Sequence, residues 1–76
     1  MEPRIKIIVN GLEFLVEETV TYEQIVELAG KRGNPTVVYS SKKRGDSQRS
    51  GEMHTGCRPV RVEPFMVFSA MHTGNA

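Results

Sequence analysis

The dipeptide Asn10-Gly11 separates two short apolar runs, Ile5 to Val9 and Leu12 to Val16. Asparagine and glycine both tolerate the positive φ angles of a type I′ turn, the turn that best suits a two-residue connection between antiparallel strands. We therefore expect a tight β-hairpin at this point. Side chains alternate along a strand, so the first run should present two faces: Ile5, Ile7 and Val9 on one, Lys6, Ile8 and Asn10 on the other.

A helix start is marked by Thr21 and Gln24, which fit the capping box: each side chain can bond the free backbone N–H of the other residue. Apolar residues then recur at helical spacing and fall on one face: Tyr22, Ile25, Val26 and Ala29, with Leu28 at its margin. Gly30 or Gly33 can adopt the left-handed conformation that ends a helix. We therefore expect one short helix with a single apolar face.

The second half of the chain predicts further strands. Thr36 to Ser40 is rich in β-branched residues and is typical of a strand. Residues 41–57 are polar and contain several glycines, so we expect a long loop there without regular structure. Arg58 to Val62 should form a short edge strand, because Pro59 cannot donate to a ladder. Phe65 to Met71 should form the last strand.

This order of elements predicts an α+β fold. One helix across one face of a mixed sheet of four or five strands is the β-grasp arrangement, which is well known at this chain length. We expect residues 1–71 to form one domain and residues 72–76 to form a flexible C-terminal tail. A chain of 76 residues has room for a single modest core, which excludes a two-domain enzyme with a buried cleft.

Composition excludes several other classes of protein. The single cysteine, Cys57, cannot form an internal disulfide, and no residues have the spacing of a zinc site. The longest uninterrupted apolar stretch, Phe65 to Phe68, is far too short to span a bilayer, and the first residues lack the apolar core of a signal peptide. We therefore expect a cytoplasmic protein that binds no metal, cofactor or membrane.

Charge is divided unevenly along the chain. Residues 1–30 carry six acidic and two basic side chains, a balance of −4, whereas residues 31–76 carry eight basic and three acidic ones, a balance of +5. The net charge of +1 is far from that of a typical nucleic-acid-binding domain, so we do not expect a nucleic-acid partner. The basic run Lys42 to Arg44, with Arg49, is a solvated loop, a docking surface for an acidic partner or a contact for RNA phosphates.

The titratable residues do not indicate an enzyme. Cys57 with His54 or His72 could be drawn as a nucleophile and its base, but no third group orients either pair. Both pairs also fall in segments that we expect to be mobile. The glycines of the long loop do not form a phosphate-binding loop, because no Gly-Lys-Ser/Thr element follows a strand and opens a helix. We therefore expect a protein that catalyses no reaction itself.

The C-terminal end has two interpretations. The segment Met71-His72-Thr73-Gly74 leaves the last strand and reaches a glycine near the terminus. Because glycine has no Cβ, such a tail can enter a narrow channel in which its backbone passes close to the catalytic centre of a partner enzyme. The alternative is an ordinary frayed terminus, which most domains have.

Several motifs across nearly the whole chain carry a family resemblance: the strand that ends in Val9-Asn10-Gly11, the helix from Thr21 to Ala29, the Val-Val-Tyr strand at 37–39, and a close similar to Val-Lys-Val…Gly-Met-x-Phe at 60–68. They resemble ubiquitin and, more closely, bacterial multiubiquitin-type domains. The resemblance implies a ubiquitin-like β-grasp and a protein modifier in bacterial defence against phage. It also implies three partners: an E1-like activating enzyme that uses ATP, an E2-like conjugating enzyme and a JAMM-type, metal-dependent deubiquitinase-like peptidase.

The same resemblance implies that Gly74 is the conjugated residue and that Met71, His72 and Thr73 lead to it. Ubiquitin ends in Gly-Gly, whereas here Gly74 is followed by Asn75 and Ala76. Either the peptidase removes Asn75-Ala76, or the terminus is used differently, or this copy cannot be conjugated. The target proteins stay open, as does the choice among the candidate acceptor lysines for a further copy: Lys6, Lys31, Lys42 and Lys43.

The last strand predicts a surface for partners. If Met66, Phe68 and Ala70 point inward, as the family pattern implies, then Phe65, Val67 and Met71 face outward as an apolar stripe. A single bulge would reverse this orientation. Two alternatives to a modifier share the fold: a plain interaction domain that binds partners through the same face, and a sulfur carrier, which normally ends directly in Gly-Gly.

Overall fold

The computed structural model describes residues 4–42 and 48–72 of the chain. It begins with a hairpin in which β1 (Ile5–Val9) pairs antiparallel with β2 (Leu12–Val16). Asn10 and Gly11 connect the strands with φ angles of 49° and 84°, as a type I′ turn requires. The predicted hairpin is therefore confirmed.

The helix also forms where the capping box predicts it. In α1 (Tyr22–Ala29), the N–H of Gln24 donates to the Thr21 hydroxyl at 3.2 Å, and the N–H of Thr21 donates to Gln24 Oε1 at 2.9 Å. Gly30 ends the helix with a φ of 72°. The apolar face turns inward, since Tyr22 and Ile25 are buried and Val26, Leu28 and Ala29 pack partly against the core.

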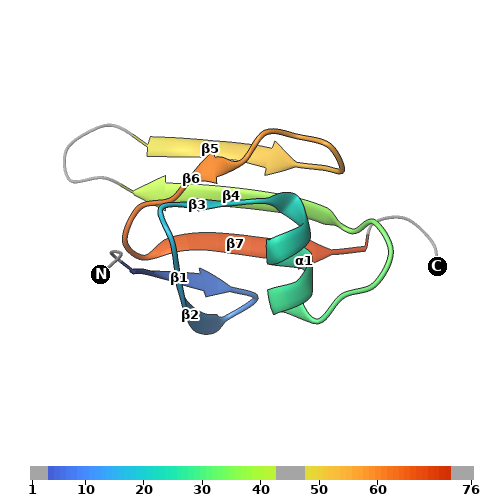
Figure 1. Cartoon of the computed structure of the whole chain (residues 1–76), viewed down its shortest axis with the longest axis horizontal. Coiled ribbons are helices and arrows are strands. Elements are labelled where there is room, and N and C mark those ends of the chain that lie inside the picture. Colours follow the sequence, from blue (N-terminus) through green and yellow to red (C-terminus); the bar gives the residue numbers. More distant parts are fainter. Residues whose placement is uncertain (1–3, 43–47, 73–76) are drawn as a thin grey trace.

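Five strands form one mixed sheet in the order β2-β1-β7-β4-β5. Its other members are β4 (Thr36–Lys42), β5 (Gln48–Met53) and β7 (Met66–Met71). The first and last strands, β1 and β7, are parallel neighbours, and the other pairs are antiparallel. The helix α1 crosses one face of this sheet (Figure 1). This is the ubiquitin-like β-grasp, so the predicted α+β fold is confirmed.

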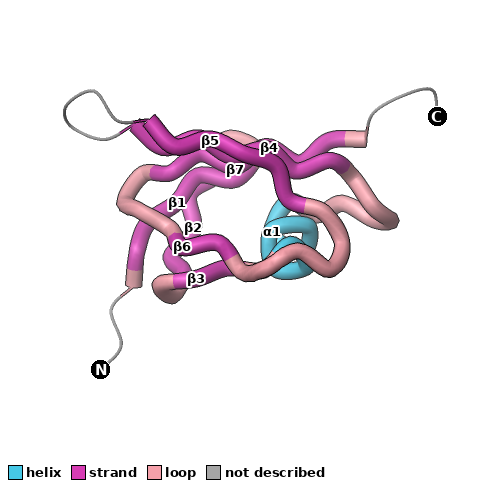
Figure 2. Tube along the Cα trace, turned by 90° about the horizontal axis from the view of Figure 1, so that it is seen from above, coloured by secondary structure: helices cyan, strands magenta, loops and turns pink. Residues whose placement is uncertain are grey.

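A second layer lies on one side of the sheet. Figure 2 shows α1 beside a short antiparallel pair, β3 (Thr19–Val20) with β6 (Val60–Arg61). The core fills the space between the two layers. Its buried apolar residues come from the helix, from every strand except β6, and from Val62, which follows β6: Ile7, Val9, Val16, Val20, Tyr22, Ile25, Val37, Met53, Val62, Met66, Phe68 and Ala70.

The prediction of a loop over residues 41–57 is wrong. The strand β4 extends to Lys42, and β5 pairs with it antiparallel from Met53, opposite Val37, to Gln48. The sequence pattern misses β5 because this strand carries too few apolar residues to show the alternation of a strand. It still forms, because an edge strand needs hydrogen-bonding partners on one side only. Residues 43–47, which include Lys43, lie outside the described residues.

Gly51, in the middle of β5, shows why this strand resembles a loop in sequence. It pairs with Tyr39, and a Cβ added at Gly51 would lie only 2.6 Å from the Tyr39 hydroxyl oxygen. The aromatic ring of Tyr39 therefore occupies the space that a side chain at position 51 would need. A glycine that usually indicates a turn here allows close packing within a strand.

The strand predicted from Arg58 to Val62 is shorter than expected. The strand β6 contains Val60 and Arg61 alone, and it pairs with β3 rather than with an edge of the main sheet. The N–H of Val62 continues this contact by donating to the Glu18 carbonyl at 2.9 Å. Pro59, which lacks an N–H, precedes the pairing, in keeping with its inability to donate to a ladder.

Candidate functional site

The outer face of the sheet, opposite α1, is formed by alternate residues of each strand. In β7 the inward residues are Met66, Phe68 and Ala70, and each is at most 1% exposed. Val67 and Met71 are 40% and 53% exposed, and Val67 lies between Ile8 of β1 and Ser40 of β4. The predicted orientation of β7 is therefore confirmed.

Large apolar side chains are exposed on this face and just before β7. We call them the outer patch: Leu15, Val38, Phe65, Val67 and Met71. A charged pair lies beside them, since Lys6 Nζ is 3.4 Å from a carboxylate oxygen of Glu13. Exposed apolar residues with a polar border are typical of surfaces that bind other proteins. The three residues predicted to bind partners all belong to the outer patch.

Phe65 occupies an unusual backbone position. The N–H of Met66 donates to the Glu63 carbonyl at 3.1 Å, which closes a β-turn around Pro64 and Phe65. Phe65 has a φ of 64° and its side chain is 64% exposed. With proline before it, this is the third position of a type II turn, where glycine is preferred. A bulky residue held at positive φ and turned to solvent is typical of a functional surface.

Phe65→Gly is expected to raise the free energy of unfolding by up to about 1.5 kcal/mol. The substitution relieves a left-handed conformation that costs an L-residue about 1–2 kcal/mol, and it adds about 0.5–1 kcal/mol of backbone entropy cost. Thermal unfolding measures the change as a higher midpoint. Phe65→Ala retains the Cβ and should show no such rise, and a lower midpoint for Phe65→Gly would mean that the aromatic ring stabilises the fold.

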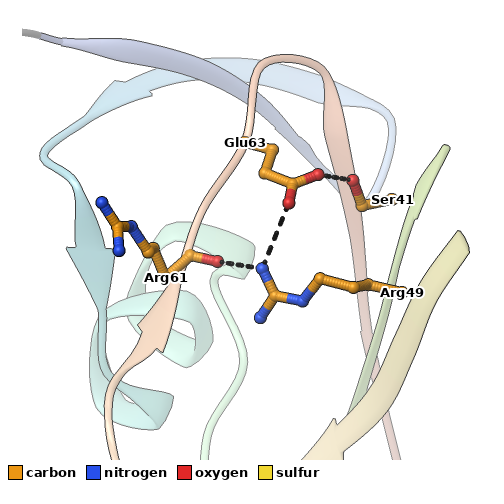
Figure 3. Close-up of polar contacts among 4 residues, drawn as sticks. All are labelled: Ser41, Arg49, Arg61 and Glu63. Atoms are coloured by element: carbon orange, nitrogen blue, oxygen red, sulfur yellow. Dashed lines mark hydrogen bonds and ion pairs between the residues drawn. The ribbon is translucent and has the colours of Figure 1, made fainter. Parts of the chain in front are cut away.

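The segment before this turn is tied to β4 and β5 by polar contacts (Figure 3). The Glu63 carboxylate accepts a hydrogen bond from the Ser41 hydroxyl and lies 3.4 Å from the Arg49 guanidinium. Arg49 also donates to the Arg61 carbonyl at 3.0 Å. Ser41 is 3% exposed, so the cluster is shielded from water on one side. Arg49 was predicted to lie in a basic loop, but it lies on β5, and its contacts with Arg61 and Glu63 fix the segment that precedes Phe65.

The end of β7 is held by the side chain of Asn10. The ladder between β1 and β7 stops at the pair Val9 and Phe68. Beyond it, the N–H of Ala70 donates to Asn10 Oδ1 at 2.8 Å, and Asn10 Nδ2 donates to the Ala70 carbonyl at 3.0 Å. The side-chain amide thus continues the ladder after β1 has turned. The sequence indicated Asn10 only as a turn residue, because nothing local shows which strand will lie beside the turn.

Asn10→Gly is expected to lower the free energy of unfolding by about 1–3 kcal/mol, since it removes two partly buried hydrogen bonds of about 0.5–1.5 kcal/mol each. Glycine tolerates the positive φ of this turn, so the substitution tests the amide and leaves the turn intact. Urea unfolding measures the loss. An unchanged midpoint would mean that the contacts between Asn10 and Ala70 contribute nothing to stability.

A family model described as multiubiquitin matches residues 5–56, from the start of β1 to just beyond β5. This chain belongs to the multiubiquitin family. The multiubiquitin match ends before β6, so β7 and the tail fall outside it. No curated protein and no solved structure matches the chain.

The structure places only some of the predicted site residues of this multiubiquitin-family protein. His72 is exposed directly after β7, whereas Thr73, Gly74, Asn75 and Ala76 lie outside the described residues. Among the candidate acceptors, Lys6 contacts Glu13, Lys31 is half-buried after α1, and Lys42 is the last residue of β4. The roles of these residues stay predictions.

The residues considered for catalysis do not meet in a cleft. Cys57 is half-buried, and in the described part of the chain no hydrogen bond joins its thiol to an imidazole. Hollows of about 290 and 310 Å³ lie beside α1, and neither is lined by Cys57, His54 or His72. Across residues 4–42 and 48–72, no three His, Cys, Asp or Glu side chains could hold a metal, and no helix could cross a membrane.

Proposed function

We propose that this protein is a ubiquitin-like modifier that is joined to other proteins through its C-terminal tail. Membership of the multiubiquitin family carries the proposal. The fold supports it, because β7 ends with the buried Ala70 and the exposed Met71, so the chain passes from the core directly to the segment that contains Gly74. The proposal includes a cytoplasmic location and a role in bacterial defence against phage.

In the proposed pathway the chain supplies a carboxylate and its partners supply the catalysis. A JAMM-type peptidase hydrolyses the bond between Gly74 and Asn75, which frees the Gly74 carboxylate. An E1-like activating enzyme then joins this carboxylate to AMP, with release of pyrophosphate from ATP. The acyl group passes to a cysteine or a hydroxyl, which releases AMP, and an E2-like enzyme delivers it to an amine of a target. The product is an amide bond, an isopeptide when the amine is a lysine.

The outer patch is the proposed surface for these partners. Phe65, Val67 and Met71 are exposed, and Val67 and Met71 alternate along β7 with the buried residues that face the core, so they lie on the opposite side of the sheet. The unfavourable backbone conformation of Phe65 supports a binding role, because it costs stability without adding to the core. On this proposal Phe65→Gly weakens binding of the activating enzyme although it stabilises the fold.

Intact mass spectrometry tests the proposed function. The full chain is incubated with the activating enzyme, conjugating enzyme and peptidase encoded beside its gene, with and without ATP. Loss of Asn75 and Ala76, followed by ATP-dependent species of higher mass, is the expected result. A mass that stays unchanged while the three enzymes are active on a control modifier would overturn the proposal.

A plain interaction domain is the second candidate function, and the exposed outer patch favours it. This candidate needs the sheet face but not the tail. Deletion of residues 72–76 separates the two: a modifier loses all adducts, whereas an interaction domain retains its partners in a pull-down. Val67→Lys adds a charge to the outer face. If the protein is an interaction domain, this variant should lose its partners in the pull-down, whereas the chain without residues 72–76 keeps them.

A further inference from the structure

The last strand loses its backbone neighbours on both sides just before the tail begins. On one side, the ladder with β1 ends at Phe68, opposite Val9. On the other side, the ladder with β4 ends at Met71, opposite Thr36, the first residue of β4. The backbone ladders therefore stop short of the tail and do not themselves hold the chain after Met71.

Side chains take over where each ladder stops. The amide of Asn10 makes two hydrogen bonds to Ala70 on the β1 side, at 2.8 and 3.0 Å. On the β4 side, the imidazole Nε2 of His72 lies 2.6 Å from the carbonyl oxygen of Arg32, in the connection between α1 and β4. A carbonyl only accepts, so Nε2 must carry the hydrogen in this contact.

The loop between α1 and β4 has a backbone conformation that allows the contact with His72. Gly33 follows Arg32 with a φ of 74°, a conformation that favours glycine and helps set the orientation of the Arg32 carbonyl. A Cβ added at Gly33 would lie 3.9 Å from His72 Nε2, which shows how closely the imidazole approaches this loop. The loop itself is anchored to the core, because the Tyr22 hydroxyl donates to the Pro35 carbonyl at 2.6 Å.

We propose that Asn10 and His72 form a clamp on the two sides of β7 and act as positioning residues for the C-terminal tail. The clamp limits the directions in which the tail leaves the fold. When the activating enzyme binds the sheet face, the tail then already points in a direction from which it can enter the channel of that enzyme. This inference rests on the proposed function for its kinetic consequence. The clamp itself is a property of the free protein and can be measured without any partner.

The structural test is backbone ¹⁵N relaxation of the free protein. In the wild type, residues 71 and 72 should have order parameters close to those of a rigid backbone, about 0.85. His72→Ala should lower the value at residue 72 to below about 0.6, the range of flexible backbone. His72→Gln should restore it, because the terminal amide of glutamine also donates from the end of its side chain.

The kinetic test is ATP–pyrophosphate exchange by the activating enzyme, with the wild type and each variant first cut by the peptidase so that they end at Gly74. His72→Ala should raise the KM for this protein about three- to tenfold, with kcat changed less than about twofold, because fewer molecules hold the tail in the competent direction. His72→Gln should remain within about twofold of the wild type. His54→Ala is the matched control, since His54 is an exposed histidine whose imidazole Nδ1 lies 3.3 Å from the carbonyl oxygen of the adjacent Thr55.

The outcomes separate the clamp from the proposed function. If the processed protein that ends at Gly74 supports no exchange, the proposed function is overturned, and the relaxation data alone then decide whether the clamp exists. Exchange with an unchanged KM for His72→Ala overturns the positioning role. An order parameter at residue 72 that is equally high in His72→Ala and in the wild type overturns the clamp. A loss that His72→Gln does not restore would also overturn it.

Discussion

On the proposed function, Gly74→Glu is expected to abolish ATP-dependent adduct formation while the thermal unfolding midpoint stays the same. The adducts should disappear because a side chain at position 74 cannot pass through a channel built for a glycine backbone. Stability should not change, since the described core ends at Ala70 in the sequence. Intact mass spectrometry of the reaction and thermal unfolding by circular dichroism measure the two effects. Gly74→Ala should give the same result with a smaller side chain.

A truncated chain provides the control for this prediction. A variant that ends at Gly74 needs no peptidase, so it should form adducts with the activating and conjugating enzymes alone. Wild-type protein should form them only when the peptidase is present. Adducts of wild-type yield from Gly74→Glu would show that the tail is attached at another residue or is not attached at all.

Phe68→Ala is expected to lower the free energy of unfolding by about 3–5 kcal/mol, the cost of removing a large buried aromatic side chain. Phe68 is fully buried in the middle of β7, and its ring centroid lies 5.8 Å from that of Tyr39. A domain of this size has a total stability of about 4–11 kcal/mol, so the variant should be partly unfolded or near its limit at room temperature. Urea unfolding followed by circular dichroism measures the loss.

Phe65→Ala is the matched control, because it makes the same chemical change three positions earlier. Phe65 is 64% exposed, and its substitution should change the free energy of unfolding by less than about 0.5 kcal/mol. Similar losses for the two variants would contradict the orientation of β7, and with it the assignment of the outer patch.

The elements that follow from local rules could be predicted from the sequence. The hairpin depends on two residues that tolerate positive φ, and the helix start depends on Thr21 and Gln24, which are close in the chain. The orientation of β7 follows from the alternation of its side chains, although the family pattern was needed to decide which face is inward. Each of these signals lies within one turn or one strand.

The elements that depend on distant partners could not be predicted in this way. The strand β5 is polar and contains Gly51, and it exists because β4 offers a ladder and Tyr39 fills the space beside the glycine. The pair of β3 and β6 joins residues that are far apart in the chain. A pattern search over neighbouring residues contains no information about either pairing.

The candidate site divides along the same line. The sequence by itself determined the apolar stripe of β7, the glycine at position 74 and the family pattern, because these depend on residue type and alternation alone. Only the tertiary structure decided that Phe65 stands at a strained turn, and that Asn10 and His72 contact backbone groups on the two sides of β7. These contacts join residues that are far apart in the chain, so no local sequence pattern indicates them. They require the sheet, which brings β1, β7 and the loop before β4 together.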